Sequence, residues 1–190
     1  MNACRVDVWT ISLTAPRELF LSPEEQARAA RFRFERDRLH WSNARSALRA
    51  ILAAQLAVHP LEIHFTLGPH GKPSVEGVEF NISHSGGLAM VAVALDTPVG
   101  IDIEHIRPNV DMAKLLRRIG EPDDPAPVQE LFQRWTRREA KTKALGTPLM
   151  EKPGADLRVV DLIPPEGFAA SLALPGRDPE VVYRLCELNS

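Results

Sequence analysis

The chain has 190 residues, 44% of them hydrophobic and 25% charged, and a formal net charge of −2. This composition is typical of a globular protein, and it excludes a disordered chain and a broadly basic nucleic-acid-binding one. No apolar stretch is long enough to span a bilayer and no leader-like segment opens the chain, so we expect a cytoplasmic protein that binds neither membrane nor nucleic acid.

The first half of the chain predicts strands on either side of two helices. Partial alternation of apolar residues indicates the first strand. Ser22, Pro23 and Glu25 then mark a helix start, because Ser22 can cap the helix and Glu25 completes a capping box. The predicted elements are a strand over residues 6–13, helices over 23–33 and 37–58, and strands over 63–67, 78–83 and 88–95.

The second half repeats this order of elements. It predicts a strand over 99–104, helices over 110–119 and 128–145, the latter stopped by Gly146, and strands over 156–161, 168–174 and 181–187. The repeated order predicts an α+β fold of two similar lobes related by a pseudo-twofold axis, each a small, mostly antiparallel sheet packed on helices. We place the lobes at residues 1–97 and 98–190. A site between two fused lobes makes a monomer sufficient.

The strand over residues 99–104 carries the first candidate for chemistry. Side chains alternate along a strand, so Ile101 and Ile103 share one face while Asp102 and Glu104 share the other. Two neighbouring carboxylates repel each other unless a cation lies between them. Mg²⁺ favours one or two carboxylates together with phosphate oxygens and water. The pair therefore predicts a divalent metal site beside a phosphate-bearing ligand.

Other polar residues suit a diphosphate ligand, although each alone has an ordinary structural explanation. Lys72 lies in a turn, where most lysines are merely solvated, and Ser83 and His84 lie at a strand end. Glu139 and Lys143 are four residues apart and share one helix face, which is also the spacing of a common surface ion pair.

Several sequence blocks together resemble the 4′-phosphopantetheinyl transferases. They are residues 80–85 (FNISHS), 100–104 (GIDIE) and 135–140 (WTRREA) with Lys143 and Gly146, joined upstream by 21–25 (LSPEE), 37–38 (DR) and 71–73 (GKP). Their order and spacing are most similar to the two-lobed type that activates peptide and polyketide synthases. The resemblance covers most of the chain as far as residue 149.

The resemblance implies a reaction and its participants. The phosphopantetheine arm of coenzyme A, the co-substrate, would move to a serine of an apo acyl or peptidyl carrier protein, releasing adenosine 3′,5′-bisphosphate. Mg²⁺, or Mn²⁺ in its place, would be held by Asp102, Glu104 and Glu139. The base would be Glu139, or Glu104 through a bound water. Lys143 would neutralise charge on the diphosphate.

The resemblance also implies residues for the nucleotide end of coenzyme A. Lys72, Ser83 and His84 match positions that bind its phosphates, and Arg28 falls near a cation for the 3′-phosphate. His40 stands where the family often has an arginine.

Two other functions stay open. The family's usual aromatic-plus-acid block is missing from residues 110–130, which leaves a non-catalytic module that binds coenzyme A or a carrier protein as an alternative. A metal-dependent diphosphate hydrolase is the third hypothesis, and it predicts cleavage of coenzyme A without an acceptor.

Overall fold

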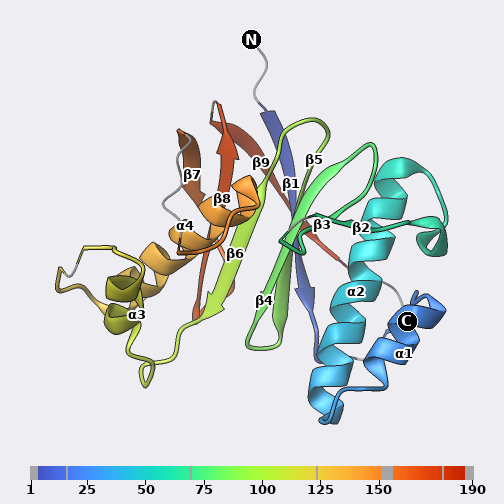
Figure 1. Ribbon diagram of the computed structural model, residues 1–190, viewed down its shortest axis with the longest axis horizontal. Coiled ribbons are helices and arrows are strands. Elements are labelled where there is room, and N and C mark those ends of the chain that lie inside the picture. Colours follow the sequence, from blue (N-terminus) through green and yellow to red (C-terminus); the bar gives the residue numbers. More distant parts are fainter. Residues whose placement is uncertain are drawn as a thin grey trace.

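The computed structural model describes residues 4–186 except positions 16, 69, 123, 151–155 and 177. Figure 1 shows the elements along the chain. They are β1 (Cys4–Ser12), α1 (Pro23–Ala29), α2 (Glu35–Leu56), η1 (Pro60–Glu62), β2 (Thr66–Leu67), β3 (Pro73–Ser74), β4 (Glu79–Ser85), β5 (Leu88–Ala94), β6 (Gly100–His105), α3 (Met112–Arg118), α4 (Val128–Leu145), β7 (Leu157–Asp161), β8 (Phe168–Pro175) and β9 (Pro179–Leu185).

These elements build two sheets, each covered by a long helix on its outer face (Figure 1). The first sheet has the strand order β4-β5-β1-β9 and the second β6-β8-β7, while β2 and β3 form a separate pair. Apart from the parallel pairing of β9 with β1, the strand pairs are antiparallel. The expected α+β class, with small and mostly antiparallel sheets packed on helices, is confirmed.

Alternation along the strands creates the layers. Trp9 and Ile11 of β1 point toward α2 and pack against Leu48. Val8, on the opposite face of β1, joins a core between the two sheets that includes Ile101 of β6 and Leu172 of β8. The described residues thus stack as helix, sheet, sheet, helix, and the seam between the sheets lies along β4 and β6.

The C-terminal strand returns to the first sheet. β9 pairs in parallel with β1, with Val181 opposite Val6 and Arg184 opposite Trp9. The second half of the chain therefore completes the sheet that the first half begins. The division into lobes at residue 97 stays a prediction.

Most predicted elements are present with small shifts at their ends. The helix over 128–145 has the predicted bounds, and the capping box of Ser22 and Glu25 is formed. The first helix ends at Ala29 rather than at residue 33, because Arg31 and Phe32 donate to carbonyls three residues back and tighten the last turn. The strand predicted over 63–67 is reduced to its last two residues, and position 187 lies outside the described residues.

Within the described residues, no helix combines the length and the apolar character that crossing a membrane would require.

Candidate active site

The two acids of β6 point away from the core between the sheets. Ile101 and Ile103 are fully buried in that core, whereas Asp102 and Glu104 face the side covered by α4. Asp102 is only 3% exposed. A carboxylate buried to this degree needs charged or hydrogen-bonding partners.

A close approach between β6 and α4 brings the second part of the site into place. A Cβ atom added at Gly100 would lie 2.1 Å from the carbonyl oxygen of Ala140 and 2.3 Å from the amide nitrogen of Ala144. Only glycine on the strand and small residues on the helix allow this contact. It sets α4 against β6 so that Lys143 reaches Asp102, with Glu139 beside Lys143 on the helix.

Polar side chains of β4 join the two sheets along the seam. Ser83 Oγ donates to Asp102 Oδ1 at 2.7 Å, and Ser85 Oγ donates to Glu104 Oε2 at 2.8 Å. The backbone amide of Ile101 donates to Asn81 Oδ1 at 2.9 Å. The sequence predicts Ser83 at the site, and the structure adds Asn81 and Ser85. The alternation of Asn81, Ser83 and Ser85, three polar residues on one face of a strand, was the signal for them.

Lys143 lies at the centre of this group. Its Nζ donates to Asp102 Oδ1 at 2.6 Å and to Ser83 Oγ at 3.1 Å, and it is 3.9 Å from Glu139 Oε2. One ammonium therefore links the acid of the strand to the acid of the helix. The expected Glu139–Lys143 pair exists, but the shorter contact of Lys143 is with Asp102.

All three acids are harder to ionise than ordinary carboxyls. Burial raises the pKa of Asp102, and the charge and hydrogen bond of Lys143 oppose this shift. Burial also raises the pKa values of Glu104 and Glu139. The charge of Asp102 raises both further, and that of Glu104 adds to the shift of Glu139. The carboxylates are thus close enough to repel one another, as expected where a cation normally relieves the charge.

The donor chemistry of the three acids fits a divalent cation. Asp102 Oδ2 is buried and has no hydrogen-bond partner, although the other oxygen has two. Hard cations take such carboxylate oxygens as ligands. As the side chains lie, however, no three acidic, histidine or cysteine residues of the described chain are gathered closely enough to hold an ion. The carboxylate of Glu139 lies 3.9 Å from Lys143 Nζ, whereas that of Asp102 lies 2.6 Å from it, so Glu139 is the acid that would have to reorient to reach a shared ion.

Two histidines lie next to this centre. The ring of His84 is exposed at its surface but has lost much of its hydration, which lowers its pKa, and the charges of Lys143 and His40 lower it further. His40 lies near the β4–β5 turn, where a Cβ atom at Gly87 would be 3.8 Å from its Cε1. A proton gained at the ring of His84 beside an anion would favour binding of that anion.

Lys72 is tied to the junction of the two sheets. Its Nζ donates to the carbonyls of Val99 at 3.2 Å and of Lys143 at 2.8 Å. The ammonium thereby caps the last turn of α4, and burial lowers its pKa. An ammonium has three donors, so one is left for a phosphate.

Arg28 lies in a separate basic pocket of about 430 Å³ beside the turn at Gly71. Its guanidinium stacks on Trp41, 5.1 Å from the ring centroid. Arg31 and Arg45 line the same pocket. Glu24 and Glu25 line it as well, and Glu25 is paired with Arg45. The guanidinium groups of Arg28 and Arg31 beside the ring of Trp41 suit an anionic group next to a flat base.

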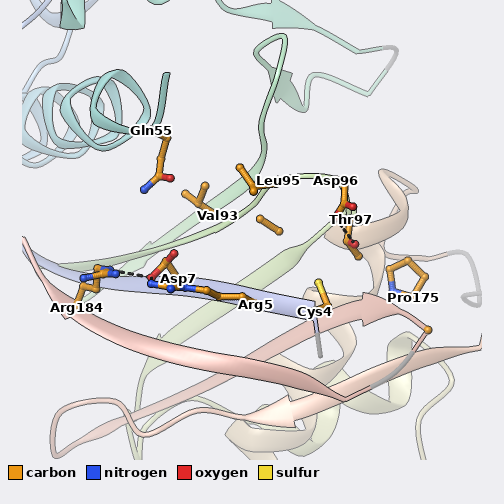
Figure 2. Close-up of a pocket in the computed structure, with 12 residues that line it drawn as sticks. Cys4, Arg5, Asp7, Gln55, Val93, Leu95, Asp96, Thr97, Pro175 and Arg184 are labelled. Carbon is orange, nitrogen blue, oxygen red and sulfur yellow. Dashed lines mark hydrogen bonds and ion pairs between the residues drawn. The ribbon is translucent and has the colours of Figure 1, made fainter. Parts of the chain in front are cut away.

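A larger pocket than the one at Arg28 lies elsewhere. Figure 2 shows this space of about 780 Å³, with Asp7 between Arg5 and Arg184 and with Gln55 and Leu95 nearby. It adjoins the start of β1 and the end of β5, whereas the acidic centre adjoins the other end of the β4–β5 hairpin. None of the predicted site residues lines it.

Comparison with known proteins identifies the family. The model of the 4′-phosphopantetheinyl transferase N-terminal domain matches residues 13–96, and that of the 4′-phosphopantetheinyl transferase superfamily matches residues 98–188. The 4′-phosphopantetheinyl transferase HetI of Nostoc sp. is 35% identical over 162 residues, which cover 74% of this chain and 68% of the relative. A putative 4′-phosphopantetheinyl transferase of Synechocystis sp., slr0495, is 31% identical over 182 residues, or 88% and 72% of the two chains. The 4′-phosphopantetheinyl transferase psf-1 of Bacillus pumilus is 37% identical over 139 residues, or 67% and 58%.

Both family models and these three relatives carry the same description, that of a transferase. The chain belongs to the 4′-phosphopantetheinyl transferase family and is an enzyme of that class.

Proposed function

We propose that the protein transfers the 4′-phosphopantetheine arm of coenzyme A to a serine hydroxyl of an apo acyl or peptidyl carrier protein, in a Mg²⁺-dependent reaction. The serine oxygen forms a bond to the phosphorus that bears the pantetheine. The bond from that phosphorus to the bridging oxygen breaks, and adenosine 3′,5′-bisphosphate leaves with the electron pair. Family membership supports the carrier protein and coenzyme A as reactants.

One observation carries the proposal for this chain: Lys143 lies 2.6 Å from Asp102 and 3.9 Å from Glu139, so acids from β6 and α4 meet around a single positive charge. Asp102, Glu104 and Glu139 are the residues that would hold the metal, which would neutralise the diphosphate when bound. The unpartnered Oδ2 of Asp102 supports this assignment.

The remaining roles follow from position and charge. Glu139, or Glu104 through a water, takes the proton of the attacking serine. Lys143 stabilises the negative charge that develops on the leaving phosphate. Ser83 and His84, at the end of β4 beside Lys143, contact the phosphates of coenzyme A.

The basic pocket at Arg28 would receive the 3′-phosphate end, with Lys72 at the neighbouring turn and His40 near the β4–β5 turn. Since coenzyme A is an intracellular metabolite, we place the reaction in the cytoplasm, with a monomer as the active form.

Mass spectrometry of carrier proteins tests the proposal. The protein is incubated with coenzyme A, Mg²⁺ and a panel of apo carriers, and each carrier serine is examined for the phosphopantetheine mass gain. Glu139→Gln should abolish the gain, whereas Arg134→Gln, which removes an ion pair with Glu130 on the same helix, should preserve it. Coenzyme A binding with no mass gain on any carrier would favour a binding module. Cleavage of coenzyme A without an acceptor would indicate a hydrolase.

A further inference from the structure

A row of polar side chains crosses the second sheet beneath α4. Asp102 of β6 lies opposite Ser171 of β8, and Ser171 lies opposite Asp161 of β7. Residues directly opposite each other in antiparallel strands point to the same face of a sheet. The three side chains therefore form one line on the face that α4 covers, starting at an acid of the proposed metal site.

The middle of this row is hydrogen-bonded to the first half of α4. Gln133 Nε2 donates to Ser171 Oγ at 2.8 Å, to the carbonyl of Ala170 at 2.9 Å and to Asp161 Oδ1 at 3.0 Å. The hydroxyls of Thr136 and Ser171 are 2.9 Å apart, and both residues are fully buried. Buried polar groups of this kind hold a defined geometry, because moving them leaves donors or acceptors unsatisfied.

The far end of the row holds one flank of the helix. Arg137 makes a bidentate contact with Asp161, donating through Nε at 2.9 Å and through Nη2 at 2.6 Å. Ala140 faces the sheet and is fully buried. At 3.6 residues per turn, Arg137 and Glu139 lie on opposite sides of the line through Ala140. The Asp161 contact on one flank thus opposes the Asp102–Lys143 contact on the other.

We propose that Asp161 and Ser171 are positioning residues that set the rotation of α4 about its own axis, acting through Arg137 and Gln133. This rotation decides how close the carboxylate of Glu139 comes to the acids of β6. The inference rests on the proposed function, since it assigns a purpose to the placement of Glu139 at a metal site. Groups that orient metal ligands in this way commonly change metal affinity when they are altered.

Metal binding by the full chain tests the inference without relying on turnover. Free Mn²⁺ is measured by electron paramagnetic resonance while the protein, saturated with coenzyme A, is titrated with the ion. We expect Asp161→Asn and Ser171→Ala each to weaken Mn²⁺ binding by about 10-fold, the size seen when groups behind a metal ligand are changed. The KM for the carrier protein should stay unchanged, because neither residue lies where the carrier serine reacts.

Matched variants separate this role from a general loss of stability. Asp161→Glu keeps the charge opposite Arg137 and should restore most of the affinity, and Arg134→Gln on the same helix should bind Mn²⁺ as the wild type does. Thermal unfolding of each variant confirms that it is folded at the assay temperature.

The two ways of failing are distinct. Wild-type Mn²⁺ affinity in both folded variants, Asp161→Asn and Ser171→Ala, would overturn the inference alone. No Mn²⁺ binding by the wild-type protein would overturn the metal assignment in the proposed function, and this inference with it.

Discussion

Gly100→Ala tests the contact that brings α4 to the acidic strand. A Cβ atom there would lie 2.1 Å from the Ala140 carbonyl oxygen and 2.3 Å from the Ala144 amide nitrogen, both of them backbone atoms that no rotamer change can move. The helix must therefore shift by roughly 1 Å or more, and overpacking of this kind costs about 1–3 kcal/mol. With backbone on the opposing side, we expect the upper end of that range.

The consequences for stability and activity follow from this shift. A loss of about 3 kcal/mol corresponds to a Tm lower by roughly 6–12 °C in a chain of this length. A misplacement of about 1 Å at Glu139 and Lys143 should cost about 10²-fold in kcat. Differential scanning calorimetry gives the first value, and steady-state transfer to an apo carrier gives the second.

A matched glycine provides the control. Gly68→Ala would place its Cβ 3.5 Å from the carbonyl of Lys72, an ordinary contact, so it should change neither Tm nor kcat appreciably. Wild-type Tm and kcat in Gly100→Ala would refute the reasoning, because α4 could then not lie against β6 as described.

Three other changes have defined outcomes. Glu139→Gln should raise the Tm of the metal-free protein at neutral pH, because the raised pKa of Glu139 means that its ionised carboxylate is unfavourable in the folded state. The gain in Tm should shrink as pH falls through that raised pKa and vanish below about 4.3, where Glu139 is protonated in the folded and the unfolded state. A lower Tm of the variant at pH 7 would contradict this. Glu25→Gln should lower the free energy of unfolding, measured in urea, by about 3 kcal/mol, because it breaks a buried ion pair with Arg49. Asp37→Asn removes an exposed ion pair and should lower that free energy by less than about 0.5 kcal/mol. Equal losses in the two variants would contradict the burial of the first pair. Lys143→Gln should lower kcat by about 10²-fold with little change in the KM for the carrier, and unchanged kcat would remove this residue from the chemistry.

The sequence was informative where local chemistry decides the outcome. Pro127 and Gly146 flank a periodic segment, and the helix between them has the predicted bounds. Alternation at Ile101 and Asp102 correctly assigned the faces of β6, because a strand cannot place neighbouring side chains on one side.

Contacts between distant segments could not be predicted in the same way. The polar row under α4 depends on β8 lying between β6 and β7, a strand order that no local pattern encodes. Likewise, Lys72 caps the last turn of α4 only because the two sheets meet there. The return of β9 to β1 has the same origin, since pairing partners are chosen by the whole fold.

The central claim is that acids from β6 and α4 bind one metal ion together. Anomalous diffraction from a crystal of the protein with coenzyme A and Mn²⁺ tests it most directly. We predict a single peak beside the diphosphate, with carboxylate oxygens of Asp102, Glu104 and Glu139 as ligands at roughly 2.1 Å. A peak at another place, or one bound by β6 alone while Glu139 still faces Lys143, would contradict the account.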